Sequence, residues 1–240
     1  MSGTLCLVSG GSSGIGRALI ETLPFAPARV VSLSRRPAPI GVHVAVDLAE
    51  PAGWARASEV FEKEIAGFGG ERVLFVHAAG TLTPIGFAGE VDPAAYRRNV
   101  LLNAAAPQVL GDAFLRALRT TSAEALLLFI GSGAASSVYP GWSSYGAGKA
   151  AVAQWTRTAG AEQARRGRRC RVVCVAPGVV ATAMQEEIRA TDRERFPEVE
   201  RFVALEREGA LRDPREVARE LWSLVTGDLP NGAVLDLRTR

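Results

Sequence analysis

The stretch TLCLVSGGSSGIG, residues 4–16, stands close to the start of a chain of 240 residues. An apolar run leads into a glycine-rich turn, and a helical pattern follows it. Gly10 permits a tight turn out of a strand, whereas Gly14 and Gly16 let the backbone approach a ligand and let the helix pack on the sheet. The free N–H groups at such a helix N-terminus suit a pyrophosphate. The stretch therefore predicts a dinucleotide-binding α/β fold, with a Gly/Ser surface turn as the alternative.

Strand-like and helix-like patterns alternate along the rest of the chain. Further strands are predicted at residues 29–33, 42–46, 73–77, 125–130, 171–175 and 233–236, and helices at 15–23, 51–66, 93–118, 145–166 and 214–226. Several strand segments are continuous apolar runs, which is typical of parallel strands buried on both faces. We expect one Rossmann-type doubly wound domain over residues 1–240, with a seven-stranded parallel sheet flanked by helices on both faces. The charged, irregular segment 181–211 interrupts the alternation after a strand and is predicted to be a substrate lid.

The composition, with 48% hydrophobic and 22% charged residues, is that of a soluble globular protein. No apolar run approaches the roughly 18 residues of a membrane helix, so we expect no membrane partner. The net charge of +3 includes five arginines within residues 165–171. A nucleic-acid patch and a solvated helix end are the two interpretations, and without interleaved aromatics we expect no nucleic-acid partner.

The three cysteines, Cys6, Cys170 and Cys174, lie in strand-like apolar segments and lack metal-ligand spacing. We therefore expect buried free thiols, no metal, and a reducing, cytoplasmic location.

Two motifs outside the glycine turn carry chemistry. Arg35 and Arg36 follow the second strand, where a dinucleotide fold meets the adenosine ribose, and no Asp or Glu stands there. Arginine pairs with the 2′-phosphate of NADP, so NADP(H) is the predicted cofactor. Tyr145 and Lys149 share one face of a helix, where an ammonium can stabilise the tyrosinate left after proton donation to a carbonyl. Lys149 is one of two lysines beside 26 arginines, which favours a site that requires a compact ammonium.

The GxxxGxG spacing of the first turn, together with the YxxxK pair, resembles the short-chain dehydrogenase/reductase family. The resemblance implies a catalytic role for Ser132, which orients the carbonyl oxygen beside Tyr145 and Lys149. It also implies that Asn103 supports a water relay to the lysine, with Asn99 as the competing position. The implied cofactor contacts are Gly10, Ser12, Ser13, Gly14, Ile15, Gly16, Arg35, Arg36, Asp47, Leu48, Ala79, Gly80, Tyr145, Lys149, Pro177, Gly178, Val180 and Thr182.

Asp47, and His77 just before the predicted contacts Ala79 and Gly80, have competing interpretations. Asp47 either holds the adenine amino group, as the family does, or caps the helix that follows. The segment His77-Ala78-Ala79-Gly80 departs from the family's Asn-Asn-Ala-Gly. His77 is more readily structural than a catalytic base, because Tyr145 is the better proton donor.

The residues around Tyr145 resemble the sepiapterin reductase and benzil reductase branch of this family. That resemblance implies reduction of a ketone, either a 1,2-dicarbonyl or a pterin side-chain ketone, by an NADPH-dependent enzyme. The predicted substrate contacts are Ser132, Trp142, Tyr145, Met184 and Asp236, with Trp142 as a core residue and Asp236 as a solvent-facing residue in the competing interpretations.

Alternative functions are a 3-oxoacyl or other alcohol dehydrogenase of the same family, and a low-turnover NADP(H)-sensing protein. A small-molecule carbonyl substrate and a homo-oligomer, dimer or tetramer, complete the expected partners.

Overall fold

A computed structural model describes residues 3–239 and contains a seven-stranded, all-parallel sheet. The strand order is β3-β2-β1-β4-β5-β6-β7. The strands are β1 (Thr4–Ser9), β2 (Ala28–Ser34), β3 (Val42–Ala45), β4 (Arg72–His77), β5 (Glu124–Ile130), β6 (Cys170–Ala176) and β7 (Val234–Asp236). This sheet confirms the predicted fold class. Its central strands are buried along most of their length, as their apolar runs indicate.

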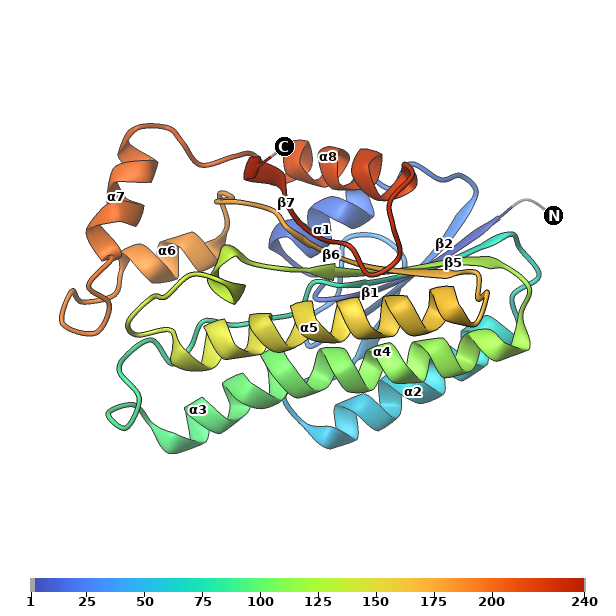
Figure 1. The fold of residues 1–240 in the computed structure, drawn as a ribbon, viewed down its shortest axis with the longest axis horizontal. Helices are drawn as coiled ribbons and strands as arrows, with labels where there is room; N and C mark the ends of the chain where they lie inside the picture. The colour runs from blue at the N-terminus through green and yellow to red at the C-terminus, as the bar shows by residue number, and fades with distance from the viewer. Residues whose placement is uncertain (1–2, 240) are drawn as a thin grey trace.

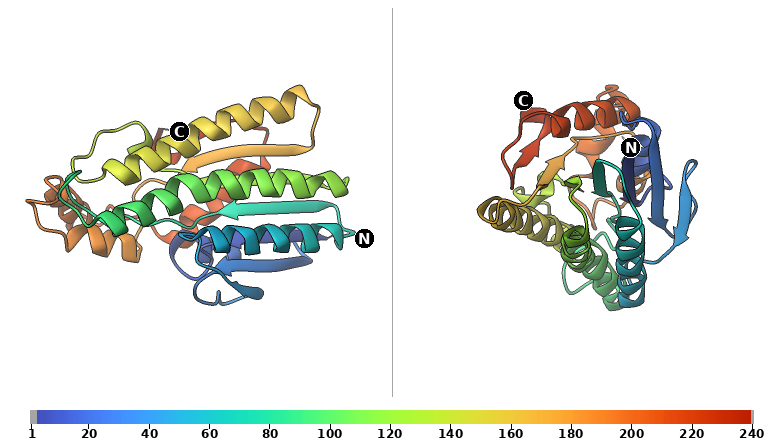
Figure 2. Two further views of the ribbon diagram at one scale, coloured as in Figure 1. Left: turned by 90° about the horizontal axis from the view of Figure 1, so that it is seen from below. Right: turned by 90° about the vertical axis from the view of Figure 1, so that its right-hand side faces the viewer.

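Helices cover both faces of this sheet (Figure 1). Helices α1 (Gly14–Glu21) and α8 (Pro214–Thr226) share one apolar core with the sheet. On the other face lie α2 (Pro51–Ala66), α4 (Ala106–Ala117) and α5 (Ser143–Arg165). The end-on view of Figure 2 shows the sheet between the two helical layers. No helix within residues 3–239 is long and apolar enough to cross a membrane.

The strand order reverses between β1 and β4. From β1 the chain proceeds outward to β2 and β3, and it then returns so that β4 pairs with the other edge of β1. Ligands of open α/β sheets bind at the carboxyl ends of strands beside such a reversal. The glycine turn at 10–16 lies at this point, directly after β1.

The helix predicted over residues 93–118 is interrupted. It consists of α3 (Pro93–Val100), a π-helical segment (Leu101–Ala105) and α4, followed by a short 3-10 turn. Asp92 caps α3 by accepting a hydrogen bond from the Ala95 N–H at 2.7 Å, as its position before Pro93 predicts. The widened turn places Asn103 at its centre, and π segments of this kind recur at functional sites.

The segment 181–211 is more ordered than its irregular pattern indicates. It contains α6 (Ala183–Arg189) and α7 (Val199–Arg207), and the pair Val180–Arg212 joins its two ends as an isolated bridge. The helical pattern is hard to recognise because each helix is short and its exposed face is dense in Glu and Arg.

The sequence interpretation of the cysteines is confirmed for their burial and their free state. Cys6, Cys170 and Cys174 are all buried and unbridged. Burial raises the pKa of Cys6 to about 12, of Cys170 to about 12 and of Cys174 to about 11. These thiols therefore stay protonated and act as small apolar side chains.

Candidate active site

A cleft of about 470 Å³ runs along the carboxyl ends of the strands. It has the volume of a small-molecule site. All but two of the predicted site residues line this one cleft. The exceptions are Asn103 and Asp236.

The glycine turn fits a dinucleotide through its backbone. Gly10 and Gly14 have positive φ angles of 71° and 53°. A methyl group at Gly10 would lie 2.7 Å from the Ala79 N atom, and one at Gly16 would lie 2.4 Å from the Gly10 carbonyl oxygen. No side chain within residues 3–239 caps the N-terminus of α1 at Ser13. Its first N–H groups are therefore available to a phosphate.

Arg35, Arg36, Asp47 and Leu48, which the sequence predicts to meet the adenosine, all line the cleft. Asp47 accepts a hydrogen bond from the Ala49 N–H at 2.9 Å and pairs with Arg98 at 2.8 Å. Burial would raise the pKa of the Asp47 carboxyl, but the Ala49 N–H, Arg98 and Arg35 outweigh it and hold that pKa below its usual value. Asp47 thus closes a local turn and lines the cleft, but it does not cap α2, whose N-cap residue is Glu50.

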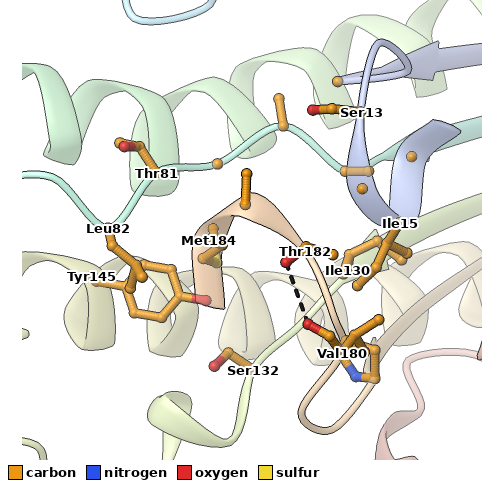
Figure 3. A pocket seen from close by; sticks show the side chains of 18 of the residues that line it. Ser13, Ile15, Thr81, Leu82, Ile130, Ser132, Tyr145, Val180, Thr182 and Met184 are labelled. Atoms are coloured by element: carbon orange, nitrogen blue, oxygen red, sulfur yellow. Dashed lines mark hydrogen bonds between the residues drawn. The ribbon is translucent and has the colours of Figure 1, made fainter. Parts of the chain in front are cut away.

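Ser132, Tyr145 and Lys149 lie together in the middle of the cleft. Ser132 follows β5 and accepts a hydrogen bond from the Ala134 N–H at 3.2 Å. Figure 3 shows the hydroxyl groups of Ser132 and Tyr145 facing the same part of the pocket, with Thr182 and Met184 across from them. The buried Lys149 donates from Nζ to the Ile130 carbonyl at 2.8 Å, and its Nζ lies 5.7 Å from the centre of the Tyr145 ring. The ammonium is therefore held beside the tyrosine by the end of β5.

Asn103 lies behind this group. Its Nδ2 donates to the Thr81 carbonyl at 2.8 Å, and its Oδ1 accepts from the Thr81 N–H at 3.2 Å. A methyl group at Gly80 would lie 3.0 Å from Asn103 Oδ1 and 3.8 Å from Lys149 Nζ, so only the small Gly80 separates the amide from the ammonium. Asn99 instead donates to the backbone carbonyls of residues 81–83. Of the two asparagines, Asn103 is the one whose amide lies next to Gly80.

His77 is buried at the end of β4 and lies outside the lining of the cleft. Its Nδ1 lies 2.9 Å from Ser9 Oγ, which in turn accepts from the Ala79 N–H at 3.4 Å. Burial, with a smaller contribution from Lys149, lowers the pKa of His77 to about 3. A neutral, enclosed imidazole supports the turn that carries Ala79, and these contacts favour its structural interpretation.

This burial predicts a pH-dependent stability. The pKa of His77 falls from 6.5 in the unfolded chain to about 3 in the folded protein, so between these values the unfolded state binds more protons. The stability that the neutral, buried His77 leaves to the folded protein is fully present above pH 6.5 and is lost as the pH falls toward 3. Between pH 7 and pH 5 it amounts to about 2 kcal/mol. Urea unfolding of the wild type and of His77→Asn checks this, and equal pH slopes for the two proteins would contradict it.

Aromatic residues and residues of segment 181–211 form part of the cleft wall. Trp142 stacks on Phe196 with ring centres 4.5 Å apart and also lines the cleft, so it is a core and a pocket residue at once. Met184 lines the cleft from α6 (Figure 3). The Thr83 hydroxyl donates to Glu187, which ties α6 to the loop after β4.

Asp236 differs from the expectation of a substrate contact. It is absent from the lining, and both of its carboxylate oxygens accept hydrogen bonds from Arg238, which does line the cleft. The hydrogen bond from Arg238 is the main cause that lowers the pKa of the Asp236 carboxyl.

Sequence reasoning missed further lining residues: Thr81, Leu82, Tyr139, Glu187, Ile188, Phe202 and Arg238. Thr81 and Leu82 follow a strand end, which is a signal available in the sequence. Phe202 and Ile188 carry no such signal, because only the folded lid brings them to the cleft.

The cluster of arginines at 165–171 is partly engaged with the protein itself. Arg169 donates to the Ser122 carbonyl at 2.8 Å, and Arg171 donates to the Gly227 carbonyl at 2.6 Å. These contacts join the ends of neighbouring elements, which is a structural role.

Comparisons with known proteins bear on the family and the fold of this chain. The model of the short chain dehydrogenase family matches residues 4–193. The chain is 31% identical to a benzil reductase ((S)-benzoin forming) of Bacillus subtilis, with 98% of each chain covered. It is 28% identical to the sepiapterin reductase of Bos taurus, with 97% of this chain and 94% of that protein covered. The crystal structure of a short chain dehydrogenase/reductase from Saccharomyces cerevisiae superposes with a TM-score of 0.82 at 23% identity, over 97% of this chain and 95% of the other.

Proposed function

This chain belongs to the short-chain dehydrogenase family, and on that basis we propose that it is an NADPH-dependent carbonyl reductase acting on 1,2-dicarbonyl compounds. The observation that carries the proposal is the intact group of Ser132, Tyr145 and Lys149 in the cleft that begins at the glycine turn. Similarity to a benzil reductase over 98% of both chains supports the substrate class. A protein that only senses the cofactor would not need this complete set of side chains.

NADPH, when bound, supplies the hydride that reduces the carbonyl carbon. Ser132 donates a hydrogen bond to the carbonyl oxygen, where negative charge develops. Tyr145 donates a proton to the same oxygen, and the Lys149 ammonium stabilises the tyrosinate that remains. Asn103 and the backbone at Thr81 lie behind Lys149 and support the return of a proton through water. The lid at 181–211, with Met184 and Thr182 at its start, excludes water from the reacting group.

The preference for NADPH comes from Arg35 and Arg36. A guanidinium pairs with the 2′-phosphate through charge-assisted hydrogen bonds, each worth about 1.5–3 kcal/mol. Arg35→Ala is expected to raise the KM for NADPH about 10- to 100-fold and to leave the KM for NADH unchanged. Arg36→Ala is expected to have the smaller effect of the two. Initial rates with both cofactors check this.

Arg17→Ala is the matched control, because Arg17 lies on α1, pairs with Glu21 and is not part of the cleft lining. If Arg35→Ala raises the KM for NADPH no more than Arg17→Ala does, the assignment of Arg35 to the phosphate site is wrong.

The substrate class is tested with a panel of compounds at one NADPH concentration. Benzil, 1-phenyl-1,2-propanedione, sepiapterin, a 3-oxoacyl thioester and a simple monoketone cover the proposed function and its rivals. We expect the highest kcat/KM for the two diketones. A clear preference for the thioester would replace the proposal with a 3-oxoacyl reductase, and a preference for sepiapterin would replace it with a pterin ketone reductase. A homo-oligomer and a cytoplasmic location stay predictions from the sequence.

A further inference from the structure

The end of β7 carries an ion pair that the expected site did not include. Arg238 donates from Nε to Asp236 Oδ1 at 2.9 Å and from Nη2 to Asp236 Oδ2 at 2.6 Å. The Arg238 backbone N–H also donates to Asp236 Oδ1 at 2.9 Å. Both carboxylate oxygens are therefore used, and the guanidinium is held in one orientation.

The guanidinium lies against the turn that carries the catalytic serine. In the sheet Asp236 is paired with Ala176, so the chain after β7 emerges beside the segment that follows β6. A methyl group at Gly133, the residue after Ser132, would lie 2.5 Å from Arg238 Nη2. One at Gly178 would lie 3.2 Å from Arg238 Cγ. The absence of side chains at both glycines makes room for the arginine in the cleft lining.

Not all donors of this guanidinium are used. Arginine has five N–H groups. Within residues 3–239 the side chain donates only to Asp236, through Nε and Nη2. The two hydrogens on Nη1 and the second hydrogen on Nη2 remain for a group that enters the cleft, which Arg238 lines together with Ser132 and Gly133.

We propose that Arg238 determines substrate specificity by donating a hydrogen bond from Nη1 to the second carbonyl oxygen of a 1,2-diketone. This inference rests on the proposed function and specifies its substrate class. The acceptor is a neutral oxygen because Asp236 already balances the charge of the guanidinium. The Asp236 carboxylate would repel a carboxylate of the substrate.

The test compares two substrates that differ by one oxygen atom. Benzil has two adjacent carbonyl groups, and deoxybenzoin has a methylene in place of one of them. Arg238→Met keeps an unbranched, flexible side chain and removes its hydrogen-bond donors. We expect kcat/KM for benzil to fall about 10- to 100-fold in Arg238→Met, as expected for loss of a hydrogen bond from a charged donor. For deoxybenzoin we expect a change of less than about 3-fold, because that ketone has no oxygen for Arg238 to bind.

Two further measurements keep the result interpretable. NADPH affinity, measured by fluorescence, should be the same in wild type and Arg238→Met, since a general distortion of the cleft would weaken it. Asp236→Asn leaves the guanidinium in place but holds it less firmly, so it should lower kcat/KM for benzil by less than Arg238→Met does.

The outcomes separate this inference from the proposed function. An equal loss with benzil and deoxybenzoin would overturn the role of Arg238 while leaving the reductase activity established. A wild-type preference for phenylglyoxylate over benzil that disappears in Arg238→Met would overturn the neutral acceptor. If the wild type reduces no ketone at all, the proposed function itself fails.

Discussion

Tyr145→Phe is expected to lower kcat for diketone reduction by about 10²- to 10⁴-fold, the contribution of a positioned proton donor. The ring of Tyr145 is buried and packs edge-on against Trp142, with ring centres 5.7 Å apart. Phenylalanine keeps this packing and removes only the hydroxyl that faces the pocket (Figure 3). The fold and the affinity for NADPH should therefore be unchanged. Steady-state kinetics together with a fluorescence titration of NADPH measure both quantities.

Tyr96→Phe is the matched control for this substitution. Tyr96 lies on α3, and its hydroxyl is 3.3 Å from Ser143 Oγ, outside the lining of the cleft. Tyr96→Phe should retain wild-type kcat. If Tyr145→Phe also retained it, another group would have to donate the proton, and the proposed chemistry would be wrong.

Substitution of Lys149 is expected to have the second largest effect. Lys149→Met removes the charge that stabilises the tyrosinate, and we expect kcat to fall about 10²-fold or more. Lys149→Arg keeps the charge but should not restore activity. The lysine is buried and its Nζ donates to the Ile130 carbonyl at 2.8 Å, and an arginine would bring a larger, planar group to this buried position.

The other lysine of the chain supplies the control. Lys63 is exposed on α2 and does not line the cleft, so Lys63→Met should leave kcat unchanged. Wild-type kcat in Lys149→Arg would show that charge alone suffices at this position. The proposed requirement for a compact ammonium at position 149 would then be wrong.

The fold was largely predictable because its signals are local. The apolar run and glycines of residues 4–16 mark the first strand, the turn and the helix that meets the cofactor. The continuous apolar runs mark strands that are buried on both faces. Asp213 before Pro214 marks the start of α8, where the Asp213 carboxylate accepts from the Arg215 and Glu216 N–H groups.

The parts that could not be predicted depend on contacts distant in sequence. The π segment brings the Asn103 amide to Thr81, which lies in the loop after β4. The sequence around Asn103 does not show this partner. The helices of segment 181–211 are short, and Phe202 of α7 is recognisable as a core residue only through its contact with the distant Trp142, with ring centres 5.5 Å apart. Asp236 and Arg238 are close in sequence, but the place of Arg238 beside Ser132 depends on the pairing of β7 with β6.

The central claim is that this chain turns over NADPH with a diketone in the cleft at Tyr145. The most direct measurement follows NADPH consumption by the wild type with benzil and quantifies the reduced product by chromatography. The account predicts that NADPH is consumed and benzoin is formed in equal amounts, over many turnovers. Tight binding of NADPH without any reduced product, from benzil or any other ketone of the panel, would contradict it and would favour a cofactor-sensing protein.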